Sequence, residues 1–277
     1  MSDFVLNKIQ DLARWISGRL GRDSWFICKA RPFYERALAA LAPSSAVPRS
    51  INGEPFRIDP RYRHLLSENY ERPVADFLKR HVRPGDVCFD VGANVGIYVL
   101  QLGRLVSARG KIVAFEPNPA AREVMERHAE LNGLQDRLLV VPAAVGEHSG
   151  ERAFYSVREN ATARLDEPNT TAAPDSIRST VMVTSIDEFV DRTGIEPRWI
   201  LMDIEGHELQ ALLGSRRTIE RLKGQIGFIV EMHPGAWPGI GAERSAVERL
   251  FSQLQLRHEG LTGQKDPLTE YGHIYLS

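Results

Sequence analysis

Short apolar runs alternate with helical patterns along most of the chain. Five runs have the length of strands: VCFDV, KIVAF, LLVVPAAV, WILMDI and QIGFIV. Most are separated by stretches with apolar residues at helical spacing, which cover residues 97–106, 120–131 and 209–222. Apolar strands without alternation are typical of a sheet covered on both faces, and intervening helices indicate βαβ crossovers. The pattern predicts an α/β fold with a doubly wound, mostly parallel sheet.

One connection is too long for an ordinary loop. After Val145, residues 150–183 hold two alternating segments, RAFYSV and TVMVTSI, around a polar stretch. This pattern predicts a hairpin and loop inserted near the mouth of the sheet. The polar side chains of the loop either hydrogen-bond a sugar-like ligand or face only water, and they are Asn160, Thr162, Asn169, Thr170 and Thr171.

The first part of the chain predicts an appendage. Its apolar residues recur at steps of three or four with basic residues between them, and they are Val5, Ile9, Leu12, Ile16 and Leu20. This amphipathic helix either packs against its own domain or a second copy of the chain, or lies on a membrane surface. Residues 42–60 are rich in Pro, Ser and Gly, which predicts a linker. We expect residues 1–60 to form a helical appendage and residues 61–277 the α/β domain.

Composition and charge narrow the class of protein. The 277 residues are 43% hydrophobic, enough to bury a core without disulfides or metals. The formal net charge of -1 excludes a dedicated nucleic-acid binder, which needs a basic surplus. Cys28 and Cys88 form neither a disulfide framework nor a zinc ribbon, and no apolar stretch of about 20 residues would span a membrane. We therefore expect a cytoplasmic protein.

The candidate chemistry lies where the strands end. The first run ends in a turn that contains Asp90, Gly92, Asn94 and Gly96 and opens into a helix, whose free amides suit polar or anionic groups. The second run ends at Glu116, 20 residues after Gly96, the spacing at which a carboxylate accepts hydrogen bonds from ribose hydroxyls. Together these features predict a cofactor that contains a nucleoside.

The turn favours one nucleoside cofactor over another. A dinucleotide site uses Gly-x-Gly-x-x-Gly, but Asn94 stands where a glycine is expected and Asp90 would repel a pyrophosphate. A carboxylate in this position can pair with a cationic amino-acid group. The turn therefore predicts S-adenosylmethionine, and an NAD-dependent oxidoreductase remains a weaker alternative.

Acidic and imidazole side chains follow the fourth and fifth runs. Asp203 and Glu205 follow one, and Glu231 and His233 end the other, so all four should face the same crevice. An alcohol needs a base or a metal ion to become a good nucleophile. We expect Asp203 or His233 to take the proton and Glu205 and Glu231 to orient the acceptor. Three alternatives remain open: carboxylates that only cap the next helix, a divalent metal site, and transfer by alignment alone.

Neighbouring residues carry weaker expectations. Glu208 lies closer to the next predicted helix than Asp203 and Glu205 do, and its position indicates a carboxylate at the helix N-terminus. His207 is expected to be a surface or packing residue. Trp237 either stacks on a sugar ring or anchors its own loop.

These motifs resemble a known family. DVGANVG, FEP, NGL followed by VVPAAVG, and MDIEGHE look like the FkbM family of S-adenosylmethionine-dependent O-methyltransferases, over about residues 68–233. The resemblance implies a Rossmann-like methyltransferase fold and methyl transfer to a hydroxyl of a saccharide or a polyketide-type product. The chain departs from many relatives at Met202, where they carry Lys, and no role is assigned to this position.

The resemblance also implies roles for single residues. The turn residues would hold the methionine end of the cofactor, Glu116 the ribose, and Ala144 would border the adenine. Tyr70 and Glu71 match a pair that precedes the first motif and would close over the cofactor. A module that keeps the nucleoside pocket without catalysis, and docks a partner, is the competing hypothesis.

Overall fold

The computed structural model describes residues 46–63, 65–156, 163–168 and 176–277, with a few isolated positions before residue 46. The chain divides into two compact units, Met1–Tyr70 and Glu71–Ser277. Most of the predicted amphipathic helix and the five polar residues of the inserted loop lie outside the described residues. Among the helices that are described, none combines the length and the apolar character that crossing a membrane requires.

The first unit contains a β-hairpin where the sequence predicted a linker. Strands β1 (Val47–Ile51) and β2 (Glu54–Ile58) pair antiparallel. The connecting Asn52 and Gly53 both have positive φ, 51° and 85°, as the favoured two-residue hairpin turn requires. The linker prediction is therefore wrong here, because apolar residues alternate on both sides of an Asn-Gly turn.

The second unit is built on a seven-stranded sheet in the order β12-β13-β11-β10-β3-β4-β5. The five strands from β11 to β5 are parallel, and β13 runs antiparallel to β11 and β12. The strands are β3 (Val87–Val91), β4 (Lys111–Phe115), β5 (Leu138–Val141), β10 (Trp199–Met202), β11 (Gly227–Met232), β12 (His258–Gly260) and β13 (Gly272–Leu276). Strand order reverses between β3 and β10, so the predicted doubly wound sheet is confirmed.

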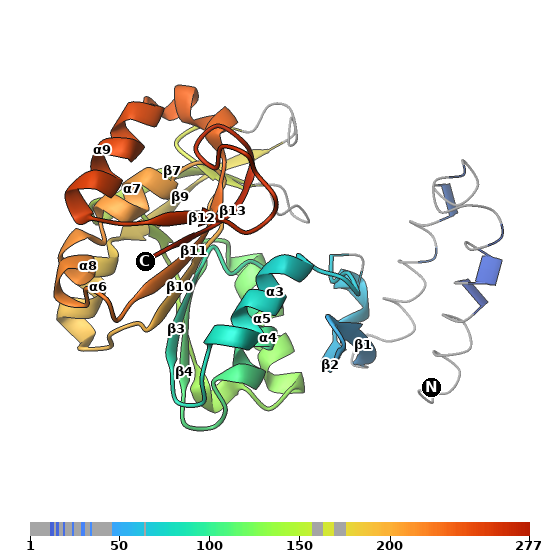
Figure 1. The fold of residues 1–277 in the computed structure, drawn as a ribbon. Coiled ribbons are helices and arrows are strands. Elements are labelled where there is room, and N and C mark those ends of the chain that lie inside the picture. The colour runs from blue at the N-terminus through green and yellow to red at the C-terminus, as the bar shows by residue number, and fades with distance from the viewer. Residues whose placement is uncertain are drawn as a thin grey trace. The chain divides into compact units, whose positions relative to one another are not determined.

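Helices cover both faces of this sheet (Figure 1). One face carries α3 (Arg72–His81), α4 (Ile97–Leu105) and α5 (Pro119–Leu131). The other carries α6 (Ile186–Thr193), α7 (Glu208–Leu213), α8 (Arg216–Arg221) and α9 (Arg244–Leu254). The strands are apolar on both faces because both are buried.

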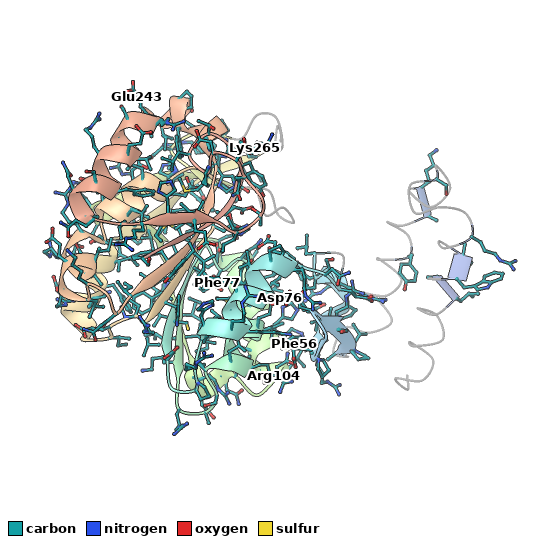
Figure 2. All side chains as sticks on the ribbon, viewed as in Figure 1. Phe56, Asp76, Phe77, Arg104, Glu243 and Lys265 are labelled. Atoms are coloured by element: carbon teal, nitrogen blue, oxygen red, sulfur yellow. The ribbon has the colours of Figure 1, made fainter. Side chains whose placement is uncertain are left out.

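Aromatic side chains pack the layers together. Phe89 and Phe115, on neighbouring strands, meet Phe189 of α6 with ring centroids 5.0 to 5.5 Å apart. On the opposite face Phe77 points from α3 toward the sheet (Figure 2) and lies 4.8 Å from the ring of Tyr275. Tight packing on both sides holds the carboxyl ends of the strands in place.

The inserted segment folds as expected. Strands β7 (Gly150–Ser156) and β9 (Ile177–Thr184) pair antiparallel. They belong to a second sheet, β6-β9-β7-β8, with β6 (Ala144–Val145) and β8 (Arg164–Leu165). Ala144, Phe154, Leu165 and Val183 form a small core of their own.

Two elements are shorter than the sequence predicted. The run LLVVPAAV breaks after β5, because Pro142 has no N–H to continue the ladder, and its last two residues join the second sheet as β6. The helix predicted for residues 209–222 is divided into α7 and α8 at Gly214. A Cβ on Gly214 would lie 2.1 Å from the carbonyl oxygen of Gly146, so this backbone approaches another loop closely.

Candidate active site

The turn after β3 is held directly against the end of β10. Gly92 has a φ of 85°, and a Cβ there would lie 1.9 Å from the carbonyl oxygen of Asp203. Gly96 has a φ of 84°, and a Cβ there would lie 2.8 Å from Met125 Cγ. Asn94 also has a left-handed φ, 47°. Only glycine fits at the first of these positions, so the turn and the end of β10 form one rigid rim.

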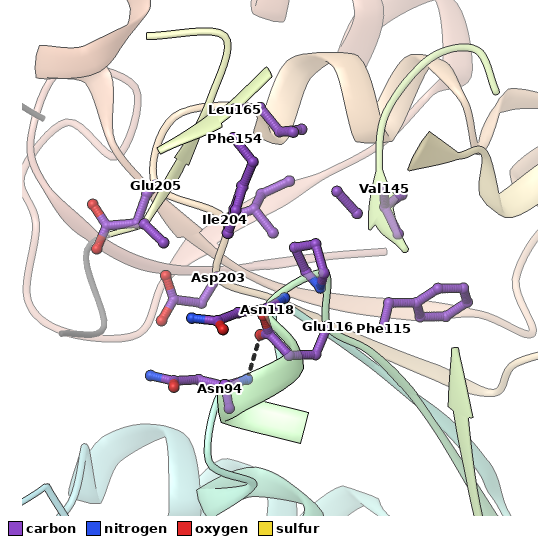
Figure 3. A pocket seen from close by; sticks show the side chains of 15 residues that line it. Asn94, Phe115, Glu116, Asn118, Val145, Phe154, Leu165, Asp203, Ile204 and Glu205 are labelled. Atoms are coloured by element: carbon purple, nitrogen blue, oxygen red, sulfur yellow. Dashed lines mark hydrogen bonds between the residues drawn. The ribbon is translucent and has the colours of Figure 1, made fainter. Parts of the chain in front are cut away.

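Glu116 joins two turns at the end of β4. Its Oε2 accepts the backbone N–H of Asn94, and its Oε1 accepts that of Asn118, both at 2.7 Å (Figure 3). Burial raises the pKa of Glu116 to about 7, although the two backbone hydrogen bonds and Arg122 oppose the shift. The carboxylate is therefore fixed by backbone donors.

Asp90 lies within β3, 3% exposed. Burial, and then the nearby Glu116, raise its pKa to about 7. Among the described residues, its Oδ2 is buried and has no hydrogen-bond partner. Buried polar atoms are normally paired, so this oxygen indicates a site that a donor from a ligand would complete.

A pocket opens beside these carboxylates (Figure 3) and holds about 640 Å³, part of it open to solvent. Six residues named from the sequence line it: Gly92, Asn94, Glu116, Ala144, Asp203 and Glu205. Asn118, Phe154 and Leu165 also line it and were missed. Phe154 and Leu165 come from the second sheet, so only the alternation of RAFYSV could have indicated an inward-facing aromatic.

Asp203, Glu231 and His233 meet beside the pocket. One ligand atom from each lies within 4.8 Å of the others, and Glu71, Glu231 and His273 form a second such group. Burial, followed by the charge of Glu231, raises the pKa of Asp203 well above its usual value. Its Oδ1 is buried and has no hydrogen-bond partner among the described residues. These residue types could hold a divalent cation as well as a proton.

His233 is held on one side and faces carboxylates on the other. Its Nδ1 lies 2.8 Å from Glu208 Oε1. Its Nε2 lies 3.8 Å from both Glu205 Oε2 and Glu231 Oε2. Burial lowers the pKa of His233, but the hydrogen bond to Glu208 and the surrounding carboxylates outweigh it and raise the pKa overall.

The alternative that Asp203 and Glu205 cap the next helix is not what the structure shows. Helix α7 begins after His207, and no side chain caps it. His207 is 5% exposed, with its Nε2 3.5 Å from Asp166 Oδ2, so of the two expectations the structure agrees with a packing residue and not with a surface residue.

Trp237 anchors its loop. It is 3% exposed, and its Nε1 donates to Glu208 Oε2 at 3.4 Å. Of the two alternatives that the sequence left open, the structure agrees with the loop anchor and not with stacking on a sugar ring. Glu208 is fully buried and tied to His233, and the sequence interpretation missed it as a site residue because spacing alone places it inside a helix.

The inserted sheet reaches the same site through Arg164, whose Nη2 lies 3.5 Å from Glu205 Oε2. Burial raises the pKa of Glu205, while His233 and Arg164 oppose the shift.

Glu71, at the start of α3, accepts a hydrogen bond from the hydroxyl of Tyr98 and lies 3.1 Å from His273 Nε2. It does not line the pocket, and Tyr70 belongs to the other unit.

A doubly wound sheet with a glycine turn and a terminal carboxylate at its reversal defines a Rossmann-like, nucleoside-binding class of protein. The methyltransferase FkbM domain matches residues 90–258, more than half of the chain. The chain therefore belongs to the FkbM family of methyltransferases, as its motifs predicted.

Three individual proteins are similar to parts of this chain. The chain is 28% identical over 195 residues to the hexuronic acid methyltransferase AglP of Haloferax volcanii, covering 68% of this chain and 71% of the relative. It is 34% identical over 76 residues to the ribosomal protein L11 methyltransferase of Pelotomaculum thermopropionicum, but only 27% of this chain and 24% of that protein are covered. The crystal structure of methyltransferase FkbM from Methylobacillus flagellatus KT is similar with a TM-score of 0.46 and 17% identity, over 69% of this chain and 43% of that chain.

Proposed function

We propose that this methyltransferase transfers the methyl group of S-adenosylmethionine to a hydroxyl of a saccharide. The observation that carries the proposal is the pocket itself, which places the Asn94 turn and Glu116 on one side and Asp203 and Glu205 on the other. Its family and the name of its hexuronic acid relative support the reaction and a sugar acceptor. Hydroxyls of polyketide-type products are the second class of acceptor.

The residues of the turn after β3 would hold the cofactor. Asp90 Oδ2, which has no hydrogen-bond partner among the described residues, would accept a hydrogen bond from the ammonium group of the methionine moiety, and the backbone at Gly92, Asn94 and Gly96 would border that group. Each oxygen of Glu116 accepts one backbone N–H and keeps a lone pair for a ribose hydroxyl. Ala144, which lines the pocket, would border the adenine, and Glu71 would close over the cofactor, as the family resemblance implies.

The acceptor hydroxyl lies between the pocket and His233. Its oxygen forms a bond to the methyl carbon while the bond from that carbon to sulfur breaks, and its proton passes to His233 Nε2. Of the two predicted bases, we favour His233, because its Nε2 faces the carboxylates of Glu205 and Glu231 that would orient the acceptor, whereas burial and the charge of Glu231 raise the pKa of Asp203 and favour its protonated form. Glu205 and Glu231 accept hydrogen bonds from neighbouring hydroxyls and orient the ring.

Calorimetric titration tests the cofactor. We expect saturable binding of S-adenosylmethionine and S-adenosylhomocysteine, lost in Glu116→Ala and retained in the control Glu123→Ala, whose side chain is exposed on α5. Saturable binding of NADH without response to either sulfur ligand would refute the proposal.

Transfer of labelled methyl groups tests the acceptor. Oligosaccharides with hexuronic acids are compared with their reduced, neutral counterparts. A methyl ether survives mild alkali, whereas a methyl ester on the uronate carboxyl is hydrolysed. We expect an alkali-stable product, and a labile one would show that the acceptor group is a carboxylate.

A further inference from the structure

We propose that Glu208 is a positioning residue that fixes His233 in the tautomer with its proton on Nδ1, so that the unprotonated Nε2 faces the acceptor. The catalytic consequence rests on the proposed function, whereas the tautomer rests on geometry alone. No other role in the site has been given to Glu208.

Three groups surround the Glu208 carboxylate at the first turn of α7. Its Oε1 accepts the backbone N–H of Gly206 at 2.7 Å and lies 2.8 Å from His233 Nδ1. Its Oε2 accepts the indole N–H of Trp237 at 3.4 Å. The side chain is completely buried, and a buried carboxylate is tolerated only where donors surround it.

These contacts determine where the imidazole proton lies. Both oxygens of Glu208 accept N–H donors, from Gly206 and Trp237, so the carboxylate acts as an acceptor and His233 Nδ1 donates to Oε1. In the neutral ring, the other nitrogen then carries a lone pair. A Cβ on Gly206 would lie 2.6 Å from Ala236 Cβ. Because glycine has no Cβ, the Gly206 N–H and the loop after His233 can lie close together.

The other nitrogen faces the acceptor side. Glu205 Oε2 and Glu231 Oε2 each lie 3.8 Å from Nε2, beyond hydrogen-bond distance. The ionisable groups packed around the ring come from four elements and are Glu208, Glu205, Asp203, Glu231 and Tyr271. Tyr271 contacts the ring edge, with centroids 5.3 Å apart, and donates its hydroxyl to Glu231.

The arrangement prepares His233 for one proton transfer. When the acceptor oxygen bonds to the methyl carbon, its proton moves to Nε2, and the imidazolium that forms is stabilised by the negative charge of Glu208. Glu208 contacts neither substrate. A correctly oriented general base contributes about 10²- to 10⁴-fold to a rate, part of which depends on this partner.

The tautomer can be measured in the wild-type protein without any substrate. Nitrogen-15 NMR of labelled histidine, titrated with pH, distinguishes a protonated Nδ1 from a protonated Nε2 in the neutral ring. We expect His233 to carry its proton on Nδ1. A neutral ring protonated on Nε2 would overturn the proposal, whether or not the protein transfers methyl groups.

A second experiment tests the catalytic consequence. In Glu208→Gln, kcat should fall about 10- to 100-fold, while KM for both substrates changes less than about twofold. The acidic limb of the pH profile of kcat should move to lower pH, because the pKa of His233 loses the carboxylate that raises it. An unchanged limb, or a loss expressed only in KM, would overturn this role.

The matched control is another buried carboxylate, Asp187, which accepts backbone N–H groups of Arg217 and Thr218 at 2.9 and 2.8 Å. Asp187→Asn should lower the stability but leave the acidic limb in place. If wild-type protein transfers no methyl group, the proposed function fails, and the NMR measurement alone decides the tautomer.

Discussion

The two sides of the crevice hold their carboxylates in different ways. On the cofactor side, both oxygens of Glu116 accept backbone N–H groups from adjacent turns. On the acceptor side, Asp203 keeps a buried oxygen without a partner among the described residues, and its neighbours are the carboxylates Glu205 and Glu231. Glu116 is therefore fixed by backbone donors, whereas Asp203, like Asp90 on the cofactor side, is buried with an oxygen that has no partner among the described residues. Changes of backbone shape should act mainly through the turn that Glu116 joins, and changes of charge mainly through the buried acids.

The largest expected effect comes from Gly92→Ala, because this residue touches both sides. Its new Cβ would lie 1.9 Å from the carbonyl oxygen of Asp203, so the turn and the end of β10 must separate. We expect cofactor binding and transfer both to be lost, measured by calorimetry and by labelled methyl transfer.

The control for this substitution is Gly133→Ala, which has a similar φ of 64° but no atom within 4 Å of the new Cβ. It should cost only about 1 kcal/mol of backbone strain and leave binding intact. Equal effects of the two substitutions would show that the collision is unimportant.

Removal of the proposed base should affect only the acceptor side. We expect His233→Ala to lower kcat about 10²- to 10⁴-fold, with an unchanged dissociation constant for S-adenosylmethionine. His148→Ala, at a side chain that is 77% exposed, is the control and should change neither. A decrease of kcat below about threefold would mean that alignment of the substrates suffices without a base.

Removal of the ribose carboxylate should affect only the cofactor side. Glu116→Ala loses two charge-assisted hydrogen bonds, each worth about 1.5 kcal/mol or more, so we expect affinity for S-adenosylmethionine to fall at least about 100-fold. The NMR titration of His233 should remain as in the wild type. A change in that titration would show that the two sides are coupled.

The last expected effect is on stability and not on activity: without ligand, the free energy of unfolding should depend on pH through Asp90. The pKa of Asp90 rises on folding from 3.8 to about 7, so its contribution to stability is complete below pH about 4 and is lost as the pH rises through about 7. Asp90→Asn should therefore flatten the fall of unfolding free energy over this range by up to about 1.4 kcal/mol per pH unit. Urea denaturation at several pH values measures it, with Asp76→Asn on α3 as the control. If the unfolding free energy of Asp90→Asn fell with pH as steeply as that of the wild type, the raised pKa of Asp90 would be contradicted.

Local patterns predicted much of this molecule. The unalternating runs predicted the strands of the parallel sheet, and the glycines after β3 predicted a tight turn, since both depend on residues close in sequence. Glu116 was found in the same way, by its distance from that turn. The hairpin at residues 47–58 was missed because composition was weighed above alternation around Asn52 and Gly53.

What the sequence by itself determined is the order of the strands and helices, the turn at Gly92, Glu116, and the set of acids after β10 and β11. Only the tertiary structure decided that Glu208 is buried against His233, that Trp237 anchors its loop, and that Phe154 lines the pocket. Strand and turn preferences act between neighbours in the chain, so a sequence displays them. Contacts across 25 residues or more depend on how α7, β11 and the inserted sheet pack, and residue type alone does not specify that packing.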